Sequence, residues 1–141
     1  MATKGTLFYQ IQKIKNSKTS QVKIGANTGS IFSIDFENGL FLMVYASWRI
    51  SKEGEILTSW RGTDSENLNM HKILKSLEGD KVIKIELSDF YDITLIFEKG
   101  STLTIFCDFN PDYSFDTCWF LQTDKNTYSV NNRNAVEIEN I

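Results

Sequence analysis

The sequence predicts an α+β fold: a mostly antiparallel, twisted sheet or open barrel of about eight strands, with one helix at about residues 64–78 packed against it. Three patterns support this prediction. Apolar residues alternate with polar ones in several short segments, which is typical of half-buried strands. Gly-containing turns separate two pairs of those segments, as in β-hairpins. One further segment spaces its apolar residues as an amphipathic helix does.

The first strands are expected near Leu7–Lys15 and Val22–Ile24. A clearer alternation follows in Phe32–Phe36, and it ends shortly before Asn38-Gly39. Asn-Gly between two alternating segments is a strong hairpin signal. We therefore expect Leu40–Ile50 to return antiparallel to the preceding strand.

The helix is predicted from its two ends and its apolar stripe. Thr63 and Glu66 form the capping-box pattern that starts a helix, and Gly79 is suited to stopping one. Between them, apolar residues recur at the i, i+3, i+4, i+7 spacing: Met70, Ile73, Leu74 and Leu77. This spacing gives one apolar face, so the helix is expected to pack on a sheet.

A second hairpin is predicted around the turn Glu98-Lys99-Gly100, which repeats the turn Glu37-Asn38-Gly39 at an offset of 61 residues. Strand patterns flank both turns, so the sequence predicts an internal repeat at about residues 31–62 and 92–123. The connection after the second hairpin, residues 107–119, is longer and more acidic than its expected counterpart in the first copy, residues 49–57. The chain closes with an alternation that predicts a weak edge strand: Val136, Ile138 and Ile141.

The length of 141 residues predicts a single domain, residues 1–141, that can bury a core without disulfide or metal support. The N-terminus shows no secretory signal pattern, which favours a cytoplasmic location. Cys107 and Cys118 are expected to be reduced thiols in that compartment. The longest apolar run, Leu40 to Ala46, is too short to span a membrane.

Charge is distributed unevenly over a chain whose net charge is −3. Residues 1–62 carry eight Lys or Arg against four Asp or Glu, a balance of +4, whereas residues 63–141 carry seven against fourteen, a balance of −7. Residues 1–30 contain five lysines and no acid, which we interpret as a solvated surface because the whole chain is acidic. The acidic half favours a basic protein partner, and nucleic acid is not the expected partner.

The stretch "CDFNPDYSFDTCW" partly matches a calcium-binding loop, with Asp108, Asn110, Asp112 and Asp116 at loop positions 1, 3, 5 and 9. The match fails at position 6, where Tyr113 replaces the Gly of the sharp turn, and at position 12, where Trp119 replaces the bidentate Glu. We therefore expect neither a bound metal nor a cofactor.

No catalytic residues are predicted. His71 borders the apolar stripe of the helix, and no nucleophile signature surrounds Ser76 or Cys107. Asp89 and Asp92 are carboxylates that could do acid–base chemistry, but a turn before a strand accounts for them. The expectation is a protein that is not an enzyme.

Two sets of residues are candidates for binding. The first is a partner-binding surface in the long connection, which combines aromatic anchors with negative charge: Asp108, Asp112, Tyr113, Phe115 and Asp116. The second is a stacking platform for a nucleic-acid base or a sugar, made of the two Trp-Arg pairs that flank a tight turn: Trp48, Arg49, Trp60 and Arg61. Trp48 and Trp60 are expected to lie opposite each other on paired strands.

The pattern "YDITLIFEKGSTLTIFCDF…CWFLQT", within residues 82–123, resembles the immunity proteins of bacterial polymorphic toxin systems. The resemblance implies a non-enzymatic cytoplasmic protein that neutralises one toxin domain by binding it directly, often a basic nuclease domain. It brings no catalytic residues with it. A carrier of a small apolar ligand on a barrel-like sheet remains an alternative, because the many Phe residues could line a cavity.

Overall fold

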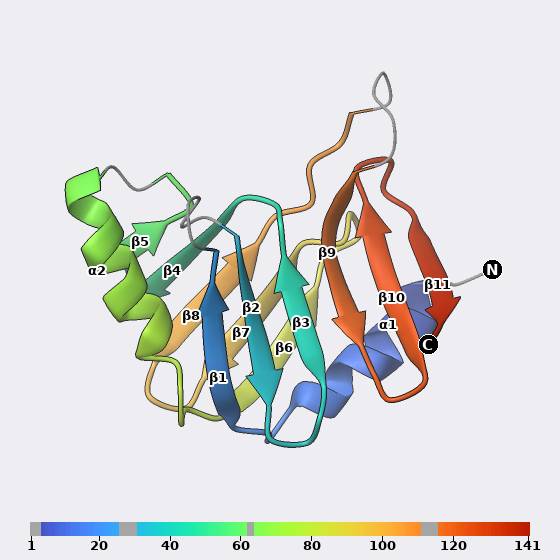
Figure 1. The fold of residues 1–141 in the computed structure, drawn as a ribbon, viewed down its shortest axis with the longest axis horizontal. Coiled ribbons are helices and arrows are strands. Elements are labelled where there is room, and N and C mark those ends of the chain that lie inside the picture. Colours follow the sequence, from blue (N-terminus) through green and yellow to red (C-terminus); the bar gives the residue numbers. More distant parts are fainter. Residues whose placement is uncertain (1–3, 26–30, 62–63, 111–115) are drawn as a thin grey trace.

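The fold combines two antiparallel sheets with two α-helices (Figure 1). The computed structural model describes residues 4–25, 31–61, 64–110 and 116–141, and only the backbone of residues 64–68. Within these residues there are eleven strands rather than about eight, in two open sheets rather than one. The α+β class and the antiparallel pairing predicted from the sequence are confirmed.

The six-stranded sheet has the order β1-β2-β3-β9-β10-β11. Its strands are β1 Thr19–Ile24, β2 Phe32–Phe36, β3 Phe41–Val44, β9 Thr117–Gln122, β10 Asn126–Asn131 and β11 Val136–Asn140. The five-stranded sheet has the order β5-β4-β8-β7-β6. Its strands are β5 Glu55–Ser59, β4 Trp48–Lys52, β8 Ser101–Ile105, β7 Ile93–Phe97 and β6 Val82–Leu87.

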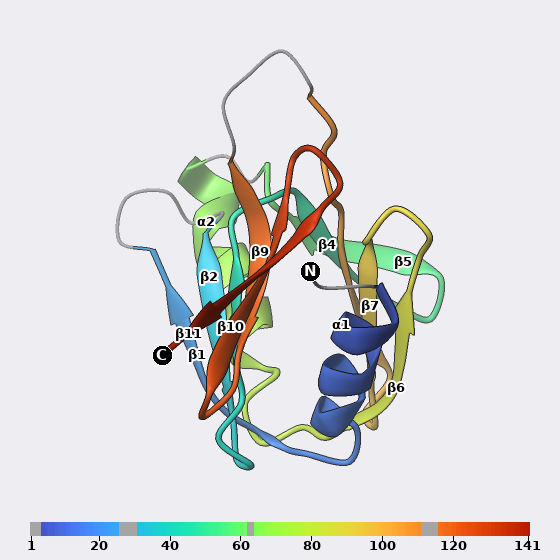
Figure 2. The same ribbon diagram turned by 90° about the vertical axis from the view of Figure 1, so that its right-hand side faces the viewer.

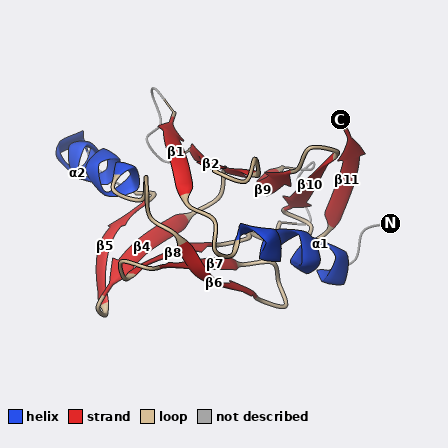
Figure 3. Cartoon of the chain, turned by 90° about the horizontal axis from the view of Figure 1, so that it is seen from below, coloured by secondary structure: helices blue, strands red, loops and turns tan. Residues whose placement is uncertain are grey.

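The two sheets lie in separate layers that face each other, and a helix lies at each side of the pair (Figure 3). α2 (Asp64–Lys75) lies beside β1 and β5, whereas α1 (Lys4–Ile11) lies on the opposite side (Figures 1 and 3). The core between the layers is aromatic as well as aliphatic. Its largest fully buried side chains include Trp48, Trp119, Phe32 and Phe97.

The two halves of the chain, residues 4–61 and 64–141, repeat the same pairing pattern. In β1–β2, Thr19 faces Phe36, and the register shifts directly after Thr19. In β6–β7, Val82 faces Phe97, and the register shifts directly after Val82. Both shifts leave one residue unpaired at the same place in the hairpin, as a β-bulge does.

Strands of each half also pair with strands of the other half. β3 pairs with β9, with Val44 opposite Trp119. In the matching place of the other sheet, β8 pairs with β4, with Ile105 opposite Trp48. The third strand of each half thus lies beside the fourth strand of the other half, which makes the two sheets mutually dependent.

The N-terminal segment is the clearest departure from the sequence prediction. Residues 7–15, expected to be a strand, instead form α1 followed by a 3-10 helix, η1 (Gln12–Ile14). Leu7, Ile11 and Ile14 are fully buried there. Their i, i+4, i+7 spacing is helical, and their burial against the sheets outweighs the alternation that favoured a strand.

The segment Leu40–Ile50 is also not one strand as predicted. It divides into β3 and β4, and the short connection at residues 45–47 moves the chain from the six-stranded to the five-stranded sheet. The turn before it is confirmed, with Gly39 at φ +91°, and Gly100 holds the equivalent position at φ +105°. These left-handed conformations suit Gly because it has no Cβ.

α2 confirms the predicted helix in type and place. Met70, Leu74 and Leu77 are buried, and Ile73 packs against the same core, while Gly79 ends the segment at φ +82°. The proposed capping residue Thr63 and the side chain of Glu66 lie outside the described residues.

The end of this helical segment also covers the edge of β1. Lys75 Nζ donates to Val22 O at 2.5 Å, and Val22 N donates to Glu78 Oε2 at 2.8 Å. Glu78 and Lys75 also pair with each other at 3.3 Å. Because an open strand edge exposes unpaired backbone groups, these contacts protect the sheet from pairing with another chain.

Candidate functional site

Four connections meet at one end of the molecule, the upper end in Figures 1 and 2. They are β3–β4 (residues 45–47), β6–β7 (residues 88–92), the described ends of β8–β9 (residues 106–110 and 116) and β10–β11 (residues 132–135). Two of them contain residues other than Gly in the left-handed region, Tyr91 at φ +68° and Asn134 at φ +60°. Such conformations cost free energy and persist where the surroundings hold them, so these two loops are held in place by their neighbours.

The structure corrects which connections correspond between the halves. The predicted counterpart of the long stretch, residues 49–57, spans β4, its turn and the start of β5. The connection that occupies the same place between paired strands is residues 45–47, between β3 and β4. The β8–β9 connection is therefore a long insertion relative to a very short turn.

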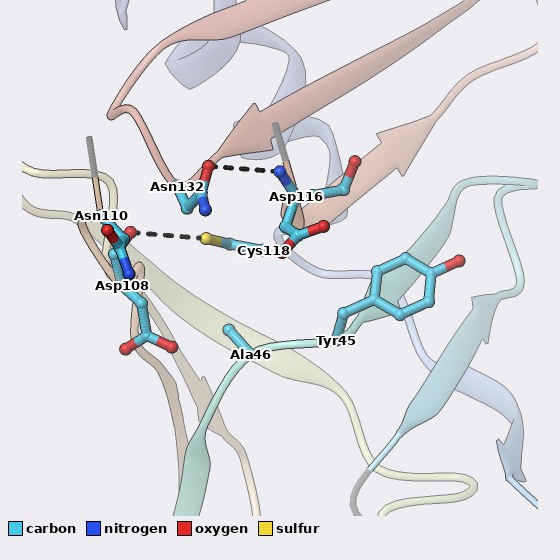
Figure 4. A pocket seen from close by; sticks show the side chains of 8 residues that line it. Tyr45, Ala46, Asp108, Asn110, Asp116, Cys118 and Asn132 are labelled. Carbon is cyan, nitrogen blue, oxygen red and sulfur yellow. Dashed lines mark hydrogen bonds between the residues drawn. The ribbon is translucent and has the colours of Figure 1, made fainter. Parts of the chain in front are cut away.

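Asn132 makes hydrogen bonds to both ends of the β8–β9 connection. Its carbonyl accepts a hydrogen bond from Asn110 N at 2.8 Å, and its own N donates to Asp116 O at 2.9 Å. Its side-chain Oδ1 accepts from Asp116 N at 3.2 Å (Figure 4). Asn132 is only 7% exposed. One buried residue of the β10–β11 turn thus sets the spacing of the residues that enter and leave the long connection.

Further hydrogen bonds fix the neighbouring loops to one another. Asp92 Oδ1 accepts from Cys107 N at 2.7 Å, which attaches the β6–β7 loop to the start of the long connection. Asn134 Nδ2 donates to Phe90 O at 2.8 Å, and the indole nitrogen of Trp119 donates to Tyr91 O at 2.9 Å. These bonds give the upper end a defined geometry.

Cys107 and Cys118 meet below the connection, with their sulfur atoms 3.5 Å apart, and both are free thiols. They come from different sheets, since Cys107 follows β8 and Cys118 lies in β9. The hydrogen bond to Cys118, with burial in support, raises the pKa of Cys107 above its ordinary range. The same hydrogen bond lowers the pKa of Cys118.

Aromatic rings and carboxylates are exposed around this framework. Phe90 is 70% exposed and Phe109 is 65% exposed, so most of each ring is available to a partner. Asp108 and Asp116 are exposed, and neither makes an ion pair with any residue that the structure describes. Asp89 is also exposed and pairs with Lys4 at 2.8 Å, a hydrogen bond that lowers the pKa of Asp89.

The structure describes only two of the five predicted partner-binding residues. Asp108 and Asp116 lie together at the upper end, whereas Asp112, Tyr113 and Phe115 lie outside the described residues. Three residues of this end, Phe90, Phe109 and Asn132, were not among the candidates predicted from the sequence. Phe90 and Phe109 stand beside acidic residues in predicted turns, which was the available signal, but Asn132 carried no local signal.

A pocket of about 600 Å³ opens among these loops (Figure 4). Its lining comes from three of the four connections and from the start of β9, and polar and apolar atoms contribute about equally to it: Tyr45, Ala46, Asp108, Asn110, Asp116, Thr117, Cys118 and Asn132. Its volume falls within the range of ordinary ligand sites, about 300–1,000 Å³. The carboxylates and amides in this lining suit a ligand with polar or charged groups better than the wholly apolar ligand of the carrier alternative.

The four residues of the predicted stacking platform do not form one exposed surface. Trp60 N donates to Trp48 O at 3.0 Å, so the two residues adjoin as expected. Trp48, however, is fully buried, and its ring meets the edge of Phe32 in the core. It is therefore not exposed for stacking on a base or sugar. Trp60 is 40% exposed and lies under Arg61, while Arg49 lies over Phe106.

Two other residues considered for catalysis are His71 and Asp92. His71 is exposed on α2, and Asp92 accepts a hydrogen bond from the backbone N–H of Cys107. Within the described part of the chain, no group of three or more His, Cys, Asp or Glu side chains is arranged to hold a metal ion. The absence of calcium binding stays a prediction, because Asp112 is not described.

No helix in the described ranges has both the length and the apolar character needed to cross a bilayer.

Comparisons with protein-family models, with curated proteins and with solved structures found no match to this chain.

Proposed function

We propose that this chain is a non-enzymatic cytoplasmic binding protein that neutralises a basic toxin domain by direct contact, as the immunity proteins that it resembles do. The contact surface is the upper end of the molecule: the β6–β7 loop, the described ends of the β8–β9 connection and the β10–β11 turn. We expect the partner to be a positively charged protein domain, such as a nuclease.

One observation supports this proposal most strongly. Phe90 and Phe109 are largely exposed on loops that are otherwise held by hydrogen bonds, and the carboxylates of Asp108 and Asp116, which make no ion pair with a described residue, lie on the same end. Aromatic anchors surrounded by charge are typical of interface centres. Holding them in place before binding lowers the entropy cost of association.

The polar groups of this end favour binding over catalysis. Asp92 accepts a hydrogen bond from the backbone N–H of Cys107 and is thereby committed to holding the loop. The carboxylates Asp108 and Asp116 are exposed, and a catalytic acid or base usually needs burial to tune its pKa. These features suit charge complementarity with a partner.

The repeated halves offer an account of how the surface arose. We infer that the two halves descend from one duplicated unit of a helix and five strands, α1 with β1–β5 and α2 with β6–β10, to which the second half adds β11. Only the second half carries the long β8–β9 connection, while the first half closes the equivalent position with residues 45–47. The surface is then an addition to one copy, and a second equivalent surface on the first copy is not expected.

The experiment is to express this chain with a basic nuclease domain encoded by the adjacent gene, and to measure both the nuclease rate and the affinity by calorimetry. We expect a tight complex and loss of nuclease activity. Asp108→Asn with Asp116→Asn should slow association and weaken its dependence on salt, because exposed charges act mainly on the association rate.

The matched control is Glu55→Gln with Glu139→Gln, which makes the same change in net charge at exposed positions on β5 and β11. The control should associate almost as fast as the unchanged chain. Equal slowing by both pairs would show that only net charge matters. A nuclease rate that stays unchanged when the chain is in excess would overturn the proposed function.

A further inference from the structure

The two sheets match in strand order except at one edge. Each contains three successive strands from one half of the chain followed by two from the other half, β1-β2-β3-β9-β10 and β6-β7-β8-β4-β5. In the six-stranded sheet, β11 pairs antiparallel with the outer side of β10. β5 holds the place equivalent to β10, and no described strand lies beyond it (Figure 3). The repeat therefore indicates an open strand position at the outer edge of β5.

The neighbouring helix does not fill this position. α2 lies at one side of the two layers, near β1 and β5, and no hydrogen bond joins it to β5 among the described residues. α1 lies at the opposite side of the layers, where β11 is (Figure 3). Since α1 and β11 occur together at that side, a strand beside β5 is compatible with α2.

The backbone of β5 turns two residues towards the open edge. Trp60 N donates to Trp48 O at 3.0 Å, so these two residues form a hydrogen-bonded pair between β4 and β5. Such pairs alternate with pairs whose N–H and C=O groups point away from each other, and Ser59 belongs to the next pair. Ile56, opposite Ser51 and beyond the bulge in β5, is turned outward by the same alternation.

The other three edges are less suited to pairing with a second copy of the chain. The edge of β1 is covered by the end of the α2 segment, and the start of β6 is paired with residues 16–18. The edge of β11 is open, but two copies paired antiparallel about Ile138 would place Glu137 of each opposite Glu139 of the other. Like charges in directly opposite positions destabilise a strand pair.

β5, in contrast, is complementary to itself. When two copies pair antiparallel with Ile56 opposite Ser59, the outward N–H and C=O groups of both strands meet. The same register brings Glu55 of one copy beside Trp60 and Arg61 of the other, and Arg61 already lies over the Trp60 ring. Opposite charges near each other on adjacent strands are stabilising. Ile56 is 65% exposed and Trp60 is 40% exposed, so both offer apolar surface for burial in the pair.

We propose that β5 is a dimerisation edge, at which two copies of the chain pair antiparallel about a two-fold axis and join their five-stranded sheets into one. A second copy is the expected occupant because the acidic start of β5 and its basic end are complementary in this arrangement. The interface is short, so the dimer belongs to the weak, concentration-dependent class. The inference is independent of the proposed function, because β5 lies outside the four connections of the upper end.

Sedimentation equilibrium of the whole chain, from micromolar to millimolar concentration, tests the dimer. We expect a monomer–dimer equilibrium. Ser59→Pro removes an N–H that β4 does not use, so the fold should survive, and the dimer should weaken by about tenfold because the loss occurs twice in each dimer. The matched control is Ile138→Pro, which removes an outward N–H from the open edge of β11 and should leave the dimer unchanged. Thermal unfolding checks the fold of both variants.

A charge exchange tests the register of the two strands. Glu55→Arg and Arg61→Glu, each made alone, should weaken the dimer roughly three- to tenfold, because like charges then meet in both symmetric contacts. The two substitutions together restore opposite charges and should recover most of the affinity. A combined variant that dimerises no better than the single ones would overturn this register.

Three sedimentation results would overturn the dimer itself. They are a chain that stays monomeric over the whole range, equal weakening by Ser59→Pro and Ile138→Pro, and species larger than a dimer, which would indicate β5 pairing with β11 of the next copy. Toxin-binding measurements that use Glu55 or Ile56 as control positions are made at concentrations where the chain is monomeric. The dimer and the proposed function can then fail separately.

Discussion

Truncating the two exposed aromatic residues is the most informative perturbation of the proposed contact surface. Full burial of a Phe side chain contributes about 1.5–3 kcal/mol relative to leaving it exposed. Phe90 is 70% exposed and Phe109 is 65% exposed, so about two thirds of that contribution remains available to a partner at each residue. The double variant Phe90→Ala with Phe109→Ala should therefore lose about 2–4 kcal/mol of binding free energy, provided that the partner covers both rings.

The same exposure predicts that the fold survives this change. Surface substitutions that touch no special feature usually alter stability by less than about 0.5 kcal/mol. Binding is measured by calorimetry against the basic toxin domain, and stability by thermal unfolding. The control is Ile56→Ala, because Ile56 is 65% exposed on β5 and lies outside the upper-end loops. The reasoning is refuted if the double variant binds as tightly as the Ile56 control, or if it unfolds.

Four further outcomes follow from the structure. Leu74→Ala should cost about 2–5 kcal/mol of unfolding free energy in a denaturant titration, since Leu74 is fully buried; a near-neutral value would contradict its role in the core. Thr19→Val should stabilise the chain by about 1 kcal/mol, because the buried Thr19 hydroxyl has no partner among the described residues; destabilisation would indicate a bound water or an unseen bond. Glu78 has a lowered pKa, mainly because it accepts from the backbone of β1, so it stabilises the fold above its ordinary pKa of 4.5. The stability deficit of Glu78→Gln should therefore be present at neutral pH and disappear as the pH falls through the lowered value; a constant deficit would contradict this. Reductant should leave the melting temperature of the untreated chain unchanged, whereas oxidation with diamide should link Cys107 to Cys118 and add on the order of 3 kcal/mol; a large drop with reductant alone would show that the chain is already oxidised.

The parts of the fold that the sequence predicts well depend on local chemistry. Gly39 and Gly100 adopt the positive φ values that tight turns require, and the hairpins around them form as expected. α2 follows the spacing of Met70, Leu74 and Leu77. In each case a few neighbouring residues determine the structure.

The sheet partners could not be read from local patterns. β4 and β9 each leave the sheet of the preceding hairpin and pair in the other sheet, with Trp48 beside Ile105 and Trp119 beside Val44. Period-two alternation places side chains on faces, but it does not say which strand lies beside which. α1 was missed for a different reason, because the strand-like alternation of residues 7–15 masked a helical spacing of the three residues that become buried.

The candidate site is partly visible in the sequence. Asp108 and Asp116 stand out because they lie in a long acidic connection. Asn132 does not, since it follows a strand and resembles any turn residue, and its importance comes from hydrogen bonds to both ends of a distant connection. Phe90 does not stand out in the sequence either, because its exposure beside that connection depends on how the two halves pack.

The most direct test of the central claim is a hydrogen-exchange footprint of the complex with the basic toxin domain. The account predicts slowed exchange in residues 88–92, 107–116 and 131–135, with little change in the lysine-rich first thirty residues. Protection confined to those first thirty residues, with the upper-end loops exchanging as in the free chain, would contradict the account.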